Sequence, residues 1–298
     1  MVTPNQQRAA AEYLRDNYDV SQRRVSQALG RARSTLRYRV RDRSAEQPLV
    51  AAIRRVARRH PRWGYRMVRA VLVREGWTVN LKCVHRLWKE LGLKRPIRRR
   101  KPNKLGPKPG SSKNSCVNQP ARFKNDIWTY DFVADRTVCG GTLKWLTLVD
   151  EYTRECIALH VDRSVTGAEV RRVLGGVIGR RSAPTRIRSD NGSEFICEAL
   201  CNWLPSKGTQ PIPVAAGSPW QNGFIESFNS RFRDEFLEAE EFESVADAEN
   251  KARWFRREYN TIRPHSSLRY KTPQAFSKEC DCGLHGKPND ELLLRSAG

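Results

Sequence analysis

Three carboxylates in the second half of the chain occupy positions where acidic side chains can do chemistry. Asp131 stands among large apolar residues at 128–133, Asp190 follows a short alternating segment at 185–189, and 35 residues separate Asp190 from Glu226. A carboxylate among apolar residues is costly unless it is paired or binds a cation, although a lone strand Asp can also be a satisfied polar group of the core. Three carboxylates meeting at one sheet edge would suit magnesium or manganese rather than zinc.

The elements that must position these carboxylates are strands and helices of one mixed sheet. Alternating and helical spacings predict strands over 126–134, 142–149, 155–161, 185–189 and 212–216, and helices over 167–178, 194–204, 220–236 and 245–259. Gly140-Gly141 is a hairpin signal between the first two strands. Three strands in a meander, followed by alternating helices and strands, indicate an α/β fold with helices packed on a mixed sheet.

The charge of the chain is concentrated in its first part. The 298 residues contain 55 Lys and Arg against 32 Asp and Glu, a net charge of +23. Residues 1–120 hold 30 of the basic and 7 of the acidic residues, whereas 121–298 hold 25 of each. Clustered Lys and Arg attract phosphate backbones through counterion release, so the first part predicts nucleic-acid binding.

Two all-α units are predicted in this basic part. Residues 1–45 read as three short helices, with capping residues at Thr3 and Ser21, in a helix-turn-helix layout or an ordinary small bundle. Residues 48–94 form a second helix-turn-helix unit, in which Asn80 caps a helix with an apolar stripe. The opposite face of that helix carries three cations that suit a phosphate backbone, or are a plain solvated face: Lys82, Arg86 and Lys89.

The segment 95–120 is expected to be a linker, because its five prolines and two glycines leave neither helix nor strand. Its basic residues, which can follow a DNA backbone, include Arg98, Arg99, Arg100 and Lys101. The catalytic core with its C-terminal helices is then assigned to 121–278, and a tail to 279–298.

Membrane and disulfide-stabilised classes are excluded by the sequence. No apolar run is long enough for a membrane span, and no secretory signal follows Met1, so a cytoplasmic location is expected. The eight cysteines lack the spacing of a zinc site, and we interpret them as free thiols.

Two residues around Glu226 are further candidates for contact with DNA. Arg233 follows Glu226 by seven residues, so on a regular α-helix their side chains differ by about 20° around the axis. A cation there could contact a phosphate beside the carboxylates, or be an exposed arginine without a role. Asn222, one turn before Glu226, could contact DNA or cap the helix start.

The sequence resembles the integrase-core transposases of bacterial insertion sequences, specifically the second-frame protein of the IS-three family. The resemblance extends over about 48–276, including Trp63-Gly-Tyr-Arg66 and Val79-Asn-Leu-Lys82. Four ordered motifs carry it: Trp128-Thr-Tyr-Asp-Phe-Val133, Ser189-Asp-Asn-Gly-Ser-Glu-Phe195, Ser218-Pro-Trp-Gln-Asn-Gly-Phe-Ile-Glu-Ser-Phe-Asn229 and Tyr259-Asn-Thr-Ile-Arg-Pro-His-Ser-Ser-Leu268.

The resemblance implies a ribonuclease-H-like core related to retroviral integrases, with Asp131, Asp190 and Glu226 as catalytic, metal-binding carboxylates. Two Mg²⁺ or Mn²⁺ ions could then support strand cleavage and transfer of the resulting 3′-OH. Family members carry Lys or Arg at the position of Arg233. The implied partners are element-end and target DNA, further copies of the chain (at least a dimer on DNA) and, in some elements, an upstream-frame protein. The expected location is the nucleoid of a bacterial cytoplasm.

Other functions remain open at this point. A ribonuclease-H-type nuclease would share the acidic site but use only water as the nucleophile. A catalytically silent DNA-binding regulator, or a partial product that needs an upstream-frame partner, would use the basic units alone. The intact set of Asp131, Asp190 and Glu226 favours an active enzyme.

Overall fold

The computed structural model describes residues 3–38, 43–93, 120–189, 198–213 and 222–283. They belong to two compact units, Met1–Ala51 and Ala52–Gly298, which are considered separately. Asp190 lies outside the described residues, as do nearly all of the predicted linker, including Arg98, Arg99, Arg100 and Lys101, and residues 284–298 of the tail. No helix within the described ranges is long and apolar enough to cross a membrane.

The first unit begins with three helices, as predicted: α1 (Pro4–Tyr18), α2 (Gln22–Ala28) and α3 (Arg33–Arg37). Thr3 caps α1 in a capping box with Gln6. Ser21 is the N-cap residue of α2, as expected, but its hydroxyl makes no cap hydrogen bond. The first backbone bond of α2 runs instead from Val25 N–H to the Ser21 carbonyl, at 3.1 Å. Backbone bonding therefore starts this helix without help from the side chain.

Three further helices follow, namely α4 (Gln47–Arg59), α5 (Tyr65–Arg74) and α6 (Leu81–Glu90). The Asn80 side chain caps α6 by accepting a hydrogen bond from Cys83 N–H at 2.7 Å. The apolar faces of α5 and α6 bury six side chains: Val68, Val71, Leu72, Val84, Leu87 and Trp88.

The core contains a five-stranded sheet in the order β3-β2-β1-β4-β5. Its strands are β1 (Ile127–Arg136), β2 (Thr142–Asp150), β3 (Cys156–Asp162), β4 (Arg186–Ser189) and β5 (Gln210–Pro213). The first three form the predicted antiparallel meander, with Gly140 at φ +80° in the turn between β1 and β2. β4 runs parallel to β1, and β5 parallel to β4. The mixed sheet expected from the sequence is confirmed.

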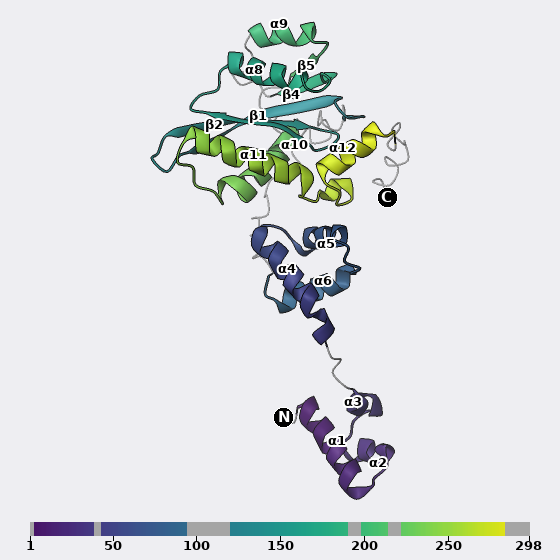
Figure 1. The fold of residues 1–298 in the computed structure, drawn as a ribbon. Helices are drawn as coiled ribbons and strands as arrows, with labels where there is room; N and C mark the ends of the chain where they lie inside the picture. Colours follow the sequence, from purple (N-terminus) through teal and green to yellow (C-terminus); the bar gives the residue numbers. More distant parts are fainter. Residues whose placement is uncertain (1–2, 39–42, 94–119, 190–197, 214–221, 284–298) are drawn as a thin grey trace, which may run out of the picture. The chain divides into compact units, whose positions relative to one another are not determined.

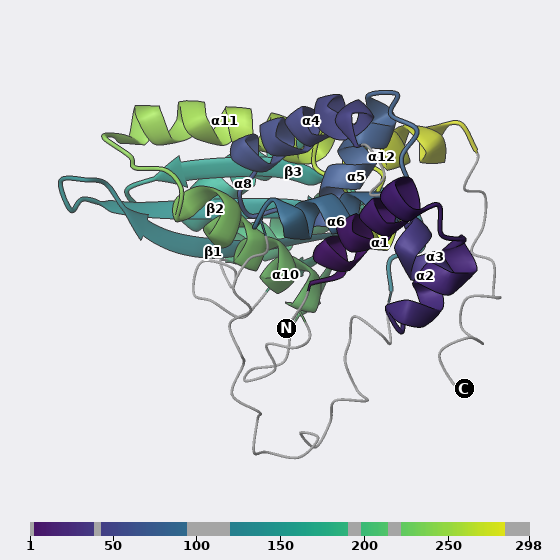
Figure 2. The same ribbon diagram turned by 90° about the horizontal axis from the view of Figure 1, so that it is seen from below.

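Helices cover both faces of this sheet (Figure 1). One face carries α8 (Gly167–Ile178) and α9 (Glu198–Ser206); the other carries α10 (Gly223–Phe232) and α11 (Val245–Thr261). Figure 2 shows α10 and α11 lying along the second face, and α12 (Pro273–Asp281) follows them in the chain. Trp145 of β2 lies in the core between the sheet and helices α10 and α11, where its ring contacts Phe232, Phe236 and Phe242.

The helix predicted over 220–236 is not uniform. α10 ends at Phe232, and Arg233–Leu237 forms a π-helical turn in which Glu238 N–H donates to the Arg233 carbonyl, five residues back, at 2.9 Å. Through this turn Phe236 stays against Phe232, with ring centroids 5.3 Å apart. Wide turns of this kind are frequent at functional sites.

The two outer strands of the sheet have unusual edges. On β3, Asn260 of α11 accepts from Cys156 N–H at 2.9 Å and donates to the Cys156 carbonyl at 2.8 Å. Arg256 donates to the Ile157 carbonyl at 2.9 Å. On β5, Pro211 and Pro213 have no backbone N–H.

The buried residue His265 follows the end of α11. The Tyr259 hydroxyl and His265 Nε2 are 2.8 Å apart. Burial raises the pKa of Tyr259, and burial together with the positive charge of Arg263 lowers the pKa of His265 from 6.5 to about 3. A neutral imidazole accepting from a protonated tyrosine satisfies both groups.

We expect acid to destabilise the core through His265. Between pH 6.5 and about 3 the unfolded chain binds a proton at this position and the folded core does not, so the free energy of unfolding falls as the pH falls. The contribution of His265 between pH 6.5 and pH 5 should be about 2 kcal/mol. Urea unfolding at pH 7 and pH 5, for the wild type and His265→Gln, measures it. The wild type should lose about 2 kcal/mol more than the variant, and equal losses would contradict the assignment.

Candidate active site

Asp131 lies in the middle of β1, half-buried, with both carboxylate oxygens fixed by hydrogen-bond donors. The N–H of Phe132 donates to Oδ1 at 2.7 Å, and Asn229 Nδ2 of α10 donates to Oδ2 at 2.8 Å. The Thr147 hydroxyl on the neighbouring strand lies 2.9 Å from Asn229 Oδ1 and so orients that amide. Each carboxylate oxygen keeps lone pairs that could bind a cation.

Glu226 is on the same helix that reaches Asp131. It precedes Asn229 by three residues, about one turn, and it is exposed while Ile225, Phe228 and Phe232 bury the opposite side of α10. The helix is held to the sheet before this turn as well, because Asn222 Oδ1 accepts from the buried Thr129 hydroxyl at 2.5 Å. Two asparagines on either side of Glu226 therefore fix its place relative to β1.

The end of β4 is held beside β1 by a buried ion pair. Arg188 aligns with Thr129, two residues before Asp131, and β4 ends at Ser189, the residue before Asp190. Arg188 Nε lies 2.9 Å from Glu151 Oε1, and both side chains are 0% exposed. Burial raises the pKa of Glu151 to about 7, against the opposing effect of Arg188.

Comparison with known proteins shows which family the chain belongs to. Family models for an integrase core domain match residues 121–219 and 207–273, and a model for an HTH-like domain matches 44–101. The chain is 35% identical to an insertion element IS407 protein of Burkholderia multivorans over 89% of this chain and 93% of that protein. It is 36% identical to an insertion element IS476 protein of Xanthomonas euvesicatoria, over 93% and 78%. This chain belongs to the IS-three family of insertion-sequence transposases.

More distant proteins also align with this transposase. The transposase InsD of insertion element IS2 from Escherichia coli is 26% identical over 74% of this chain and 75% of its own length. Among solved structures, the catalytic core domain of HTLV-2 integrase in complex with magnesium covers 52% of this chain and 97% of its own length, at TM-score 0.40 and 17% identity. The transposase has the ribonuclease-H-like fold of the integrase core, preceded by HTH-like helices, and its family is one of polynucleotidyl-transferase-type enzymes.

The structure shows where the transposase places the remaining site residues predicted from the sequence. Arg233 is exposed at the start of the π-helical turn, seven residues after Glu226. Asn222 is the N-cap residue of α10, but its side chain makes no cap hydrogen bond. Asn222 is 5% exposed, and its amide oxygen is used on Thr129 instead. That burial favours a positioning role; contact with DNA stays a prediction.

The cations predicted on α6 differ in their surroundings. Lys82 and Lys89 are exposed. Arg86 is half-buried and pairs with Glu90 at 3.1 Å, one helical turn away. The two lysines are therefore the more available to a phosphate backbone.

Sequence reasoning missed the side chains that orient Asp131. Asn229 and Thr147 are ordinary polar residues in the sequence, and only the register of β1 with β2, which aligns Asp131 with Thr147, shows their purpose. Asp150, at the end of β2, has a structural role instead. Its carboxylate accepts from the N–H groups of Asn125, Tyr152 and Thr153, and so holds a turn.

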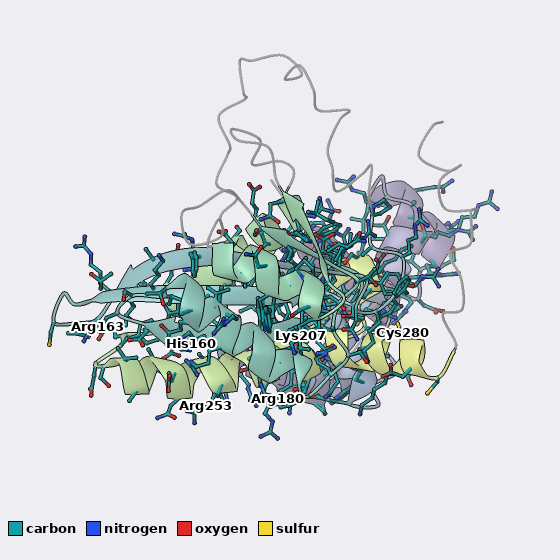
Figure 3. All side chains as sticks on the ribbon, turned by 90° about the horizontal axis from the view of Figure 1, so that it is seen from above. His160, Arg163, Arg180, Lys207, Arg253 and Cys280 are labelled. Carbon is teal, nitrogen blue, oxygen red and sulfur yellow. The ribbon has the colours of Figure 1, made fainter. Side chains whose placement is uncertain are left out.

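A second group of possible metal ligands lies away from Asp131. His160, which is labelled in Figure 3, Asp162 and Glu169 bring three ligand atoms within 4.8 Å of one another. Glu169 also accepts from Arg172 at 3.1 Å, so this cluster is balanced by an arginine.

Replacing Asn229 by Leu should weaken catalysis through Asp131. The variant removes the donor to Asp131 Oδ2 and the partner of Thr147, as loss of a group that orients a metal ligand does, and activity should fall about 10- to 100-fold. The half-saturating Mg²⁺ concentration should rise as well. DNA cleavage measured across a Mg²⁺ titration tests this. Lower activity with an unchanged Mg²⁺ dependence would contradict the prediction that Asn229 acts through the carboxylate of Asp131.

Proposed function

We propose that this chain is the DNA transposase of a bacterial insertion sequence, which binds element ends and catalyses metal-dependent strand cleavage and 3′-OH strand transfer through Asp131, Asp190 and Glu226. The observation that carries the proposal is the arrangement on α10. Asn229 fixes Asp131, and one turn earlier the same helix exposes Glu226 to solvent.

The described part of this site fits hard divalent cations. Asp131 and Glu226 offer only oxygen ligands, and the donor from Asn229 orients one of them as second-sphere groups do around metals. Two Mg²⁺ or Mn²⁺ ions, when bound, would activate the nucleophilic oxygen and stabilise the leaving oxygen. Asp190, the third ligand of the proposal, follows Ser189 of β4 directly.

The reaction needs no covalent protein intermediate. In the first step the oxygen of water attacks the phosphorus at an element end, a P–O bond breaks, and the strand leaves with a free 3′-OH. In the second step that 3′-OH attacks a phosphate of the target DNA, so that one phosphodiester replaces another. Arg233 is exposed two helical turns after Glu226, where its guanidinium would contact a phosphate near the carboxylates.

The basic units would hold the DNA. Lys82 and Lys89 of α6 and the basic residues of 95–120 supply the charge for the phosphate backbone. At least two copies of the chain are needed to bring two element ends together, and an upstream-frame protein joined to the chain is the further partner proposed. Comparing end binding by this chain and by such a fusion tests that last point, because full binding by the chain alone would remove the need for the partner.

The proposal is tested by incubating the full chain with labelled element-end duplex, a target plasmid and Mg²⁺. Strand-transfer products, absent when EDTA replaces Mg²⁺, are expected. Hydrolysis without joining would indicate a ribonuclease-H-type nuclease. Binding without either product would indicate a silent DNA-binding regulator.

A further inference from the structure

An arginine-lined groove runs along the β3 edge of the sheet. The start of β3, the end of α8 and the outer side of α11 line this open groove, which has a volume of about 540 Å³. Figure 3 labels Arg180, just beyond α8, and Arg253 of α11. The charged residues of the lining are five arginines and one glutamate: Arg180, Arg181, Arg253, Arg256, Arg257 and Glu155. The groove therefore holds four positive charges in excess, within a core whose overall charge is neutral.

Part of this charge has structural partners and part is available. Arg181 pairs with Glu155 at 2.9 Å, and Arg256 donates to a β3 carbonyl. Arg253 pairs with Glu249 at 3.4 Å, one helical turn away, but its side chain is 72% exposed. Arg180 and Arg257 are exposed, and within the described ranges their guanidinium groups have no hydrogen bond or ion pair. Arg181 and Arg256 hold the walls of the groove in place. The side chains exposed to solvent include Arg180, Arg253 and Arg257.

The groove is separate from the candidate active site. Asp131 lies on β1 and meets α10, whereas the groove lies at the outer side of β3, two strands away. At the usual strand spacing this separation is about 10 Å within the sheet. The groove would therefore contact backbone phosphates other than the one that meets Asp131 and Glu226.

A polyanion fits this groove better than a second copy of the chain. A two-fold contact through the groove would place the same excess of arginines on both sides, and like charges would repel. Arginine forks match phosphate geometry, and a concave surface lined by one sign of charge concentrates the attraction. Asn260 is not available for a base contact, because the oxygen and the nitrogen of its side-chain amide both bond to Cys156. Contacts to phosphates alone carry no base information.

We propose that this groove binds the phosphate backbone of the target duplex during strand transfer. The proposal rests on the transposase function proposed above, in which the element end occupies the carboxylate site and the target must be held beside it. The exposed guanidinium groups of Arg180, Arg253 and Arg257 supply the phosphate contacts, while Arg181 and Arg256 keep the walls in place.

The test compares two double variants of the full chain. Arg180→Gln with Arg257→Gln removes two groove charges; Arg171→Gln with Lys207→Gln removes two exposed charges elsewhere on the core. Both are assayed at about 0.1 M salt with labelled element ends and a target plasmid. The groove variant should join ends to target about tenfold less, with end cleavage within about twofold of wild type. The control variant should match the wild type in both steps.

Three results would overturn the proposal. These are equal target joining by the two variants, a parallel loss of cleavage and joining in the groove variant, and unchanged joining with reduced cleavage. A further measurement does not depend on catalysis. The slope of log affinity against log salt for a non-specific duplex should fall by about two in the groove variant relative to the control variant. An equal slope would also overturn the proposal, even if the wild type showed no transposase activity.

Discussion

The Glu226→Gln variant should lose both end cleavage and strand transfer by at least about 10³-fold, equivalent to about 4 kcal/mol of transition-state stabilisation. Both steps should fall together because, in the proposed mechanism, one set of carboxylates serves two nucleophiles, water and the 3′-OH. Glu226 is exposed while its neighbours Ile225 and Phe228 pack the helix, so the amide should leave folding and end binding unchanged.

A matched control is available on the same core. Glu241 is exposed, and its side chain has no hydrogen bond or ion pair within the described ranges. The variant Glu241→Gln therefore removes one negative charge at a position away from the proposed carboxylate site. Labelled-end assays of both variants, with a gel-shift measurement of end binding, separate catalysis from binding. Glu226→Gln activity equal to that of Glu241→Gln would show that Glu226 is not a catalytic ligand.

Removing Arg188 should have the largest effect on stability. Arg188→Met leaves the carboxylate of Glu151 buried without its cation, and breaking a buried pair in this way costs about 3–5 kcal/mol of unfolding free energy. The penalty should shrink between pH 8 and pH 5, because burial already raises the pKa of Glu151 to about 7 and the protonated carboxyl is easier to bury. Urea unfolding at the two pH values measures both effects.

The double variant with Arg188→Met and Glu151→Met provides the comparison. It removes the stranded charge and fills the space with apolar side chains, so it should recover most of the lost stability. If the double variant were as unstable as Arg188→Met alone, the loss would come from packing around Arg188 rather than from an unpaired charge.

The fold of the core could largely be predicted because its elements leave local signatures. Strands predicted at 126–134, 142–149 and 155–161 lie within two residues of β1, β2 and β3 at each end. Alternation of buried and exposed side chains is a property of neighbouring residues and needs no knowledge of the partner strand. The π-helical turn at Arg233–Leu237 was missed because it does not interrupt the apolar spacing of the helix.

The support around the candidate site could not be predicted in the same way. Asn229 and Thr147 are 82 residues apart, and Arg188 and Glu151 are 37 apart. Each pair meets because strand register and helix packing bring two distant segments together. The sequence motifs contain Asp131, Glu226 and also Asn229, but they do not show which polar residue holds which carboxylate in place.

The sheet edges described above bear on how copies of the transposase can associate. Unpaired strand edges invite another chain to add a strand, the route by which many β-proteins aggregate. Here Asn260 and Arg256 occupy the first pairing positions of β3, and two prolines remove donors from β5. Growth of the sheet from one copy into the next is therefore disfavoured on both sides. The copies proposed to bring two element ends together are therefore expected to meet through helices or through the bound DNA, and not through a shared sheet.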